Sequence, residues 1–85
     1  MANFTNLEIE AVWKKGIVVY NYNPNTYRKD YKGRWMQRSE YGNRNSQYGW
    51  EIDHKIPVSK GGSDMLSNLQ PLNWLTNLEK SDNRY

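Results

Sequence analysis

The side chains best suited to chemistry gather in one stretch of the chain, from Trp50 to Lys80. This stretch contains the only histidine, His54, which directly follows Asp53. An imidazole can accept a proton from water at neutral pH, and a carboxylate is a hard oxygen ligand for Mg²⁺ or Mn²⁺. Hydrolysis of a phosphodiester needs a nucleophilic water and relief of the charge on the phosphate and the departing oxygen, and a histidine together with a divalent cation can supply these. The pair is therefore a candidate base beside a candidate metal ligand.

A spaced set of loop and helix residues follows this pair. It consists of a Pro-bearing, Gly-rich loop, an Asn-Leu step and an Asn-x-x-Lys ending, comprising Pro57, Gly61, Gly62, Asp64, Asn68, Leu69, Asn77 and Lys80. Taken singly, two glycines indicate only a turn and an asparagine only an Asx-turn. Together, over roughly residues 50–80, they resemble the HNH nuclease motif. The core of that motif is an Asp-His pair, a Gly-Gly loop, an Asn-Leu pair and a metal-binding His or Asn on a following helix.

The resemblance implies a role for each matched residue. His54 would be the general base that activates water, and Asp53 the metal-binding acid before it. Asn68 would hold the loop of the hairpin, which keeps the base in place. Asn77 stands at the position of the second metal ligand, and Lys80 at that of the basic residue three positions further on. We therefore expect Asp53, His54, Asn68 and Asn77 to form the catalytic set, with Asp53 and Asn77 as the metal ligands.

The resemblance also implies a fold and a cofactor. The expected fold is α+β of the ββα-metal type, in one domain over residues 1–85 whose motif core covers about residues 50–81. The implied activity is that of a DNA endonuclease using one divalent cation, Mg²⁺ or Mn²⁺, with double-stranded DNA as the expected partner. Many relatives carry two Cys-x-x-Cys pairs that hold a structural zinc. This chain has no cysteine, and Asn73 and Thr76 stand where the second pair would be, so no structural zinc is expected.

The elements that must position these residues begin with a strand. The alternation from Trp50 to His54 predicts one, with Trp50, Ile52 and His54 on one face and Glu51 and Asp53 on the other. Adjacent residues of a regular strand point to opposite faces. His54 must therefore lie at a bulge or at the end of the strand if it is to work with Asp53. Glu51 could be a further acidic group near the metal, although we favour a supporting role or an ion pair.

A loop, a second strand and a helix should follow. Residues 59–64 are expected to form the loop, and residues 69–72 a strand that is either short or at an edge, because Pro71 has no N–H to donate. Asn73 is a good N-cap for a final helix that ends near residue 81 and turns Leu75 and Leu78 inward. Asn73 and Asn77 project from nearly the same side of this helix. The capping duty should use up Asn73, which leaves Asn77 for the metal.

The first half of the chain carries weaker signals. Thr5-x-x-Glu8 is a capping box that predicts a helix over roughly residues 6–15, with Gly16 in the left-handed position after it. Residues 17–22 are β-branched and aromatic and are expected to form a strand. Turns are expected at residues 23–25 and 32–33, and a short strand over residues 34–38. Residues 27–31 stay ambiguous.

Basic side chains are concentrated just before the motif. The window from residue 28 to residue 38 holds five basic residues against one acid, Asp30. We expect phosphate contacts from Arg28, Lys29, Arg34 and Arg38, with Lys60 and Lys80 adding to them; Lys32 completes the window. The alternative is a solvated face, because short charge runs are often only surface. For Lys60, a mobile solvated side chain is an equal alternative.

Composition limits the remaining possibilities. A chain of 85 residues holds one small domain, and four Trp and seven Tyr favour an aromatic core. The formal charge of +3 and the sequence pI near 9.2 favour a polyanionic partner. No apolar run is long enough to cross a bilayer and no secretory leader is visible, so a soluble, cytoplasmic, self-contained protein is expected.

Two other classes of function stay open. The first is a DNA-binding module with an HNH-like fold that cuts nothing, and the second is an interaction protein that uses exposed Trp and Tyr on a partner. Within the nuclease class, the chain could also be the nuclease domain of a bacterial toxin. Monomer and homodimer are both compatible with the sequence, as are nicking and double-strand cleavage, and RNA in place of DNA.

Overall fold

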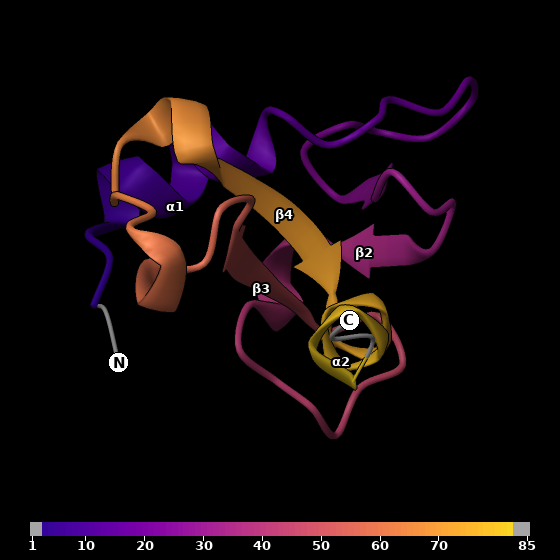
Figure 1. Ribbon diagram of the computed structural model, residues 1–85. Coiled ribbons are helices and arrows are strands. Elements are labelled where there is room, and N and C mark those ends of the chain that lie inside the picture. The colour runs from indigo at the N-terminus through magenta and orange to yellow at the C-terminus, as the bar shows by residue number, and fades with distance from the viewer. Residues whose placement is uncertain (1–2, 83–85) are drawn as a thin grey trace.

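The structure is a computed structural model that describes residues 3–82 (Figure 1). Over this range the chain forms two α-helices and two small antiparallel hairpins. The helices are α1 (Asn6–Trp13) and α2 (Trp74–Asp82), and the strands are β1 (Tyr27–Lys29), β2 (Trp35–Gln37), β3 (Trp50–His54) and β4 (Leu69–Asn73). Helix α2 directly follows β4, so the second half of the chain runs strand, loop, strand, helix. No helix within residues 3–82 has the length and apolar character that crossing a membrane requires.

Helix α1 begins as predicted and ends sooner. Thr5 Oγ1 accepts a hydrogen bond from the backbone N–H of Glu8, and Glu8 Oε1 accepts one from the N–H of Thr5. The helix stops at Trp13 with Lys14 as its C-cap, slightly before the rough end expected at residue 15. Gly16 does not adopt the left-handed conformation. A glycine suits this position for another reason, since a Cβ here would lie 3.0 Å from Arg28 Cβ.

The strand expected over residues 17–22 does not form. Ile17 makes a single bridge to Lys29, after which the segment turns away and Asn21 takes a positive φ of 71°. Four of its apolar side chains are exposed, those of Ile17, Val18, Tyr20 and Tyr22. The ambiguous stretch 27–31 instead supplies β1, which pairs with β2, and β2 is shorter than the expected strand because Arg38–Glu40 forms a 3₁₀ turn.

Asp30 fixes the turn of this first hairpin and connects it to the second. Its Oδ1 accepts hydrogen bonds from the backbone N–H groups of Lys32 and Arg34, and its Oδ2 accepts one from the N–H of Asn73. The Asp30 side chain is buried, so these bonds are shielded from water. Gly33 completes the turn with a positive φ of 91°. The β1–β2 hairpin is thereby joined to the end of β4.

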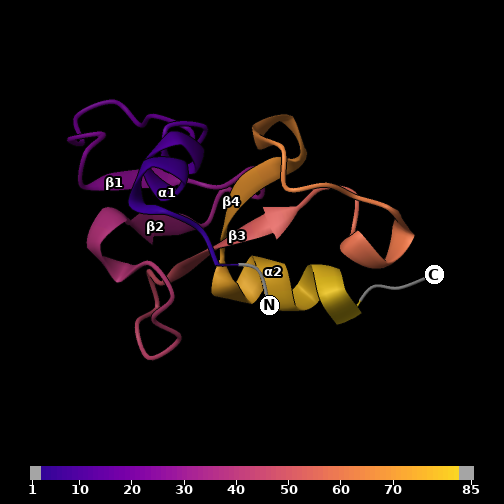
Figure 2. The same cartoon turned by 90° about the vertical axis from the view of Figure 1, so that its left-hand side faces the viewer.

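The β3–β4 hairpin lies between the two helices (Figure 2). Glu51 and Asp53 pair across it with Leu72 and Gln70, and His54 pairs with Leu69. Trp50 packs on Trp13 of α1 with the ring centroids 5.2 Å apart, at the centre of a buried cluster. The cluster contains Val12, Trp13, Met36, Trp50 and Leu69, so tryptophan and aliphatic side chains share the core. Among the described residues no tyrosine belongs to this cluster, although the ring of Tyr41 packs on that of Trp50 with the centroids 4.9 Å apart.

Helix α2 packs on the other face of this hairpin with its polar side. Thr76 is buried, Asn77 contacts Glu51, and Lys80 contacts Asp53. Leu78 is 40% exposed, so the expectation that it points inward is wrong. The reason is that this face of β3 carries carboxylates, which recruit the amide and the ammonium group of the helix instead of its leucines.

Candidate active site

The loop between β3 and β4 is tied together by one side chain, that of Asn68. Its Oδ1 accepts a hydrogen bond from the backbone N–H of Ile56 at 2.9 Å. Its Nδ2 donates to the carbonyl of Ile56 at 3.1 Å and to that of Ser63 at 2.8 Å. A single amide therefore bridges the outgoing and returning arms of the loop, immediately beside the end of β3.

The two glycines of this loop are needed for two different reasons. Gly61 ends the 3₁₀ turn Val58–Lys60 with φ of 88°, a left-handed conformation that disfavours a side chain. Gly62 has no room for one, because an added Cβ would lie 1.7 Å from the carbonyl oxygen of Ile56. The Gly-Gly pair therefore sets the compact path of the loop that follows His54.

His54 is the last residue of β3, as its expected cooperation with Asp53 requires. Its Nε2 lies 2.6 Å from Oδ1 of Asp64, which returns from the Gly-rich loop. On its other side, the ring of Phe4 lies 6.1 Å away between centroids. The His54 side chain is 17% exposed, so it is oriented from two sides and still reached by solvent. The motif spacing includes Asp64, but nothing in it indicates that Asp64 pairs with the histidine.

Asp53 points to the opposite face of β3, toward α2. Its Oδ1 accepts a hydrogen bond from Lys80 Nζ at 3.0 Å, and its Oδ2 accepts one from Gln70 Nε2 at 2.8 Å. Lys80 Nζ also donates to the carbonyl of His54 at 3.1 Å. The expected metal ligand and the expected basic residue are thus brought together as a partly buried ion pair. Gln70 was missed, although it stands directly opposite Asp53 in the register.

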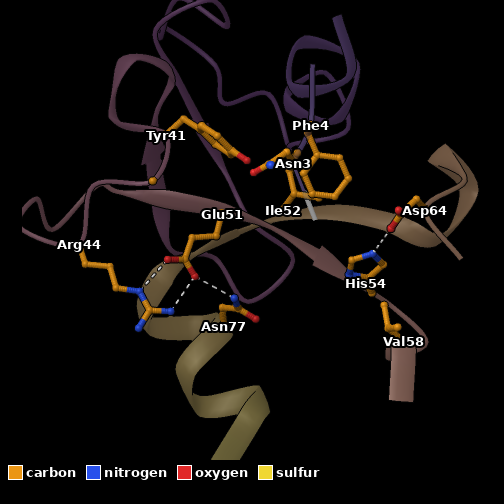
Figure 3. A pocket seen from close by; sticks show the side chains of 11 residues that line it. Asn3, Phe4, Tyr41, Arg44, Glu51, Ile52, His54, Val58, Asp64 and Asn77 are labelled. Atoms are coloured by element: carbon orange, nitrogen blue, oxygen red, sulfur yellow. Dashed lines mark hydrogen bonds and ion pairs between the residues drawn. The ribbon is translucent and has the colours of Figure 1, made fainter. Parts of the chain in front are cut away.

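Asn77 lies one helical turn before Lys80 and contacts Glu51 (Figure 3). Its Nδ2 donates to Glu51 Oε1 at 2.9 Å, while Arg44 holds the same carboxylate through Nε at 2.6 Å and Nη2 at 2.9 Å. These hydrogen bonds, first of all those from Arg44, hold the pKa of Glu51 below its ordinary value. The ion pair expected for Glu51 is therefore present, and the amide of Asn77 completes it.

Asn73 is committed to structure. It is buried, and its Oδ1 accepts a hydrogen bond from the backbone N–H of Leu75 at 2.9 Å, as predicted for an N-cap. Its Nδ2 donates to the carbonyls of Trp35 and Gln47, both at 2.8 Å. Every hydrogen-bonding group of this side-chain amide is engaged. By contrast, no group within the described residues donates a hydrogen bond to the side-chain oxygen Oδ1 of Asn77.

Several of these residues border a groove beside β3 (Figure 3). Its polar walls contain Arg44, Glu51, His54, Asp64 and Asn77, and its apolar walls contain Phe4, Tyr41, Ile52 and Val58. Burial, with a smaller effect of Glu51, raises the pKa of the Tyr41 hydroxyl. Asp53 lies beneath Lys80 on the face toward α2 and does not line the groove.

The donors available to a cation are few but suitable. Within residues 3–82 no cluster of three or more His, Cys, Asp or Glu side chains could hold a metal. Mg²⁺ is commonly held by one or two carboxylates and completes its shell with waters and substrate phosphates. One carboxylate, Asp53, and one amide oxygen, that of Asn77, are hard ligands that fit this pattern. The ammonium of Lys80 on Asp53 also marks the spot as one that accommodates positive charge.

The arginines of the basic window form hydrogen bonds and ion pairs with other groups of the protein. Arg28 donates to the carbonyls of Pro24, Lys14 and Gly16. Arg34 forms a bidentate pair with Glu79 and donates to Thr76, and Arg38 pairs with Glu10. Lys29 lies over the ring of Trp35, and Lys60 is exposed in the loop after β3. Phosphate binding by these residues stays a prediction, for which the two lysines are the better placed.

Comparison with protein families places this geometry in context. The family model described as HNH endonuclease matches residues 39–83, which is more than half of the chain and includes β3, the loop, β4 and α2. No curated protein and no solved structure matches the chain significantly.

Proposed function

The chain belongs to the HNH endonuclease family, and from this premise we propose that it is a metal-dependent endonuclease that hydrolyses DNA phosphodiester bonds. The observation that carries the proposal is a pair of side-chain contacts between β3 and α2, Glu51 with Asn77 and Asp53 with Lys80. Each contact contains one of the two proposed metal ligands. His54 follows at the end of the same strand.

His54 is the proposed general base, and its contact with Asp64 assigns the working nitrogen. An ionised carboxylate only accepts hydrogen bonds, so Nε2 must carry a proton to bond Asp64 at 2.6 Å. A neutral imidazole then has its lone pair on Nδ1. We infer that Nδ1 takes the proton of the attacking water, while Asp64 holds the ring in that tautomer.

Asp53 and Asn77 are the proposed ligands of one divalent cation, Mg²⁺ or Mn²⁺. When bound, such an ion acts as a Lewis acid toward the phosphate and the departing oxygen. Asp53 contributes a negative oxygen and Asn77 a neutral one. Asn68 contributes indirectly, because its three hydrogen bonds hold the loop that brings Asp64 to His54.

The proposed substrate is double-stranded DNA. Lys60 lies in the loop after His54 and is a proposed phosphate contact, and Lys29 of the basic window is proposed to extend it, whereas the arginines of the window are held in contacts within the protein. Lys80 is proposed to reach phosphate only after leaving Asp53. A monomer contains every residue named here, although a homodimer would be compatible with it.

Cleavage of supercoiled plasmid tests the proposal. We expect nicked or linear product with Mg²⁺ or Mn²⁺, none with EDTA, and loss of at least about a hundredfold in rate for His54→Ala with DNA binding nearly unchanged. Lys55→Ala, which changes the next residue and leaves the base in place, is the matched control. Wild-type cleavage by His54→Ala would refute the role of the base. Binding without any cleavage by the wild-type protein would favour the non-catalytic DNA-binding module.

A further inference from the structure

We propose that Glu51 is a positioning residue for Asn77, which decides which end of the Asn77 amide faces the cation. The inference rests on the proposed function, because it takes Asn77 as a metal ligand. It assigns to Glu51 and Arg44 a part in the reaction that neither would have as a surface ion pair.

The argument begins with the two ends of the amide. A cation can be bound by the Oδ1 of Asn77 and is repelled by its Nδ2, yet rotation about the last side-chain bond exchanges these two groups. Glu51 removes this ambiguity. Its ionised carboxylate only accepts hydrogen bonds, so the Nδ2 of Asn77 must face it, as the distance of 2.9 Å to Oε1 reflects. Figure 3 shows the amide oxygen turned to the opposite side.

Arg44 in turn fixes Glu51. Its guanidinium makes two hydrogen bonds to the carboxylate, one to each oxygen, in the fork geometry that gives such pairs their directionality. Arg44 comes from the loop before β3 and Asn77 from α2. Three separate segments therefore meet at this carboxylate.

Glu51 is better placed to position a ligand than to be one. Its Oε1 accepts from both Asn77 and Arg44, and its Oε2 accepts from Arg44. Both oxygens are engaged, whereas the oxygen of Asn77 has no donor within the described residues. A cation held by Glu51 would have to displace Arg44. A cation held by Asn77 leaves the contacts of Glu51 intact.

Direct titration of Mn²⁺ without DNA, by calorimetry or by electron paramagnetic resonance, tests the inference. Glu51→Gln keeps the size of the side chain, but a glutamine can present either its NH₂ or its oxygen to Asn77, so the preference is lost. We expect Mn²⁺ affinity to fall about tenfold. In an Asn77→Ala background the same substitution should cost no more than about twofold, because the residue through which Glu51 acts is gone.

The double substitution separates positioning from simple charge. Removing a negative charge weakens cation binding by itself, and that effect would appear equally in both backgrounds. Equal losses would therefore overturn the inference. Glu79→Gln is the matched control, because Glu79 lies on the same helix as Asn77 and, like Glu51, pairs with an arginine, Arg34, at 2.8 Å. A Glu79→Gln loss as large as that of Glu51→Gln would likewise overturn it.

A second measurement needs no metal. The side-chain NH₂ resonances of Asn77 should be resolved and shifted in the wild-type NMR spectrum, and should move toward free-amide positions in Glu51→Gln. Unmoved resonances would overturn the inference. Failure of the proposed metal site looks different: Asp53→Asn would then bind Mn²⁺ as the wild-type protein does, whatever Glu51 does to Asn77.

Discussion

The carboxylate of Asp53 is already balanced by a cation, the ammonium group of Lys80. The two groups are 3.0 Å apart, and their side chains are 10% and 30% exposed. A partly buried carboxylate is costly to leave unpaired, which explains why the helix provides a lysine at this place. The proposed divalent cation and Lys80 would use the same carboxylate. Metal binding should therefore require Lys80 to move.

Replacing Lys80 with methionine should reveal this competition. We expect Lys80→Met to bind Mn²⁺ several-fold more tightly than the wild-type protein in the absence of DNA, as measured by calorimetry. Without metal the variant should be less stable by about 1–3 kcal/mol, because Asp53 loses a charged partner. Lys55→Met removes the same charge close by and serves as control. An equal gain in affinity for Lys55→Met would mean that net charge, not the contact, sets the affinity.

The motif spacing indicates which residues are candidates for the site, but it says little about their partners. Asp53, His54, Asn68 and Asn77 are candidates on sequence positions alone. The contact of His54 with Asp64 depends on the path of a loop of irregular backbone. The contact of Glu51 with Asn77 depends on how α2 lies across the hairpin. Such distances result from tertiary packing, which residue types and spacing do not specify.

The junction of β4 and α2 positions the candidate site, and the side chain of Asn73 holds this junction in place. A typical N-cap contributes about 1 kcal/mol. Asn73 also donates two hydrogen bonds from a buried amide to the carbonyls of Trp35 and Gln47, which would be left without that donor in an alanine variant. The cost of losing this side chain should therefore exceed that of a cap alone.

Comparison of two asparagine variants tests this division between structure and chemistry. Asn73→Ala should cost roughly 2–4 kcal/mol of unfolding free energy, and the folded fraction should keep its Mn²⁺ affinity. Asn77→Ala should lower Mn²⁺ affinity and cleavage with less than about 1 kcal/mol lost. Denaturant melts and metal titration of both variants provide the two readouts. The reverse pattern would assign the metal to Asn73.

Elements with strong local signals were predictable, and those that depend on distant pairing were not. The capping box at Thr5 and the alternation of β3 each lie within a few residues, and both are present. The segment 17–22 has the composition of a strand but lacks a strand to pair with. The 27–31 stretch gave no clear pattern, yet it forms β1 because β2 and the turn held by Asp30 are available to it.

The basic residues expected to contact phosphate are of two kinds, which the whole molecule uses differently. The arginines of the basic window join elements that are far apart in sequence: Arg28 reaches the end of α1, Arg34 reaches α2, and Arg38 reaches Glu10. These pairs are partly exposed, so each stabilises the fold only modestly. Lys29 and Lys60 make no hydrogen bond or ion pair through their ammonium groups within residues 3–82. The net charge of +3 therefore does not distinguish basic residues that hold the fold together from those available to a phosphate.

DNA affinity measured against salt concentration distinguishes these arginines from the two lysines. Each phosphate contact that is lost should flatten the slope of log affinity against log salt by about 0.9. We expect a flatter slope for the double variant Lys29→Gln, Lys60→Gln, with a thermal melt close to that of the wild-type protein. Arg34→Gln should do the opposite, because it breaks the contacts with Glu79 and Thr76: its melt should fall while its slope is kept. If Arg34→Gln flattened the slope and the lysine variant did not, phosphate binding would belong to the arginines, and their internal pairs would have to open when DNA binds.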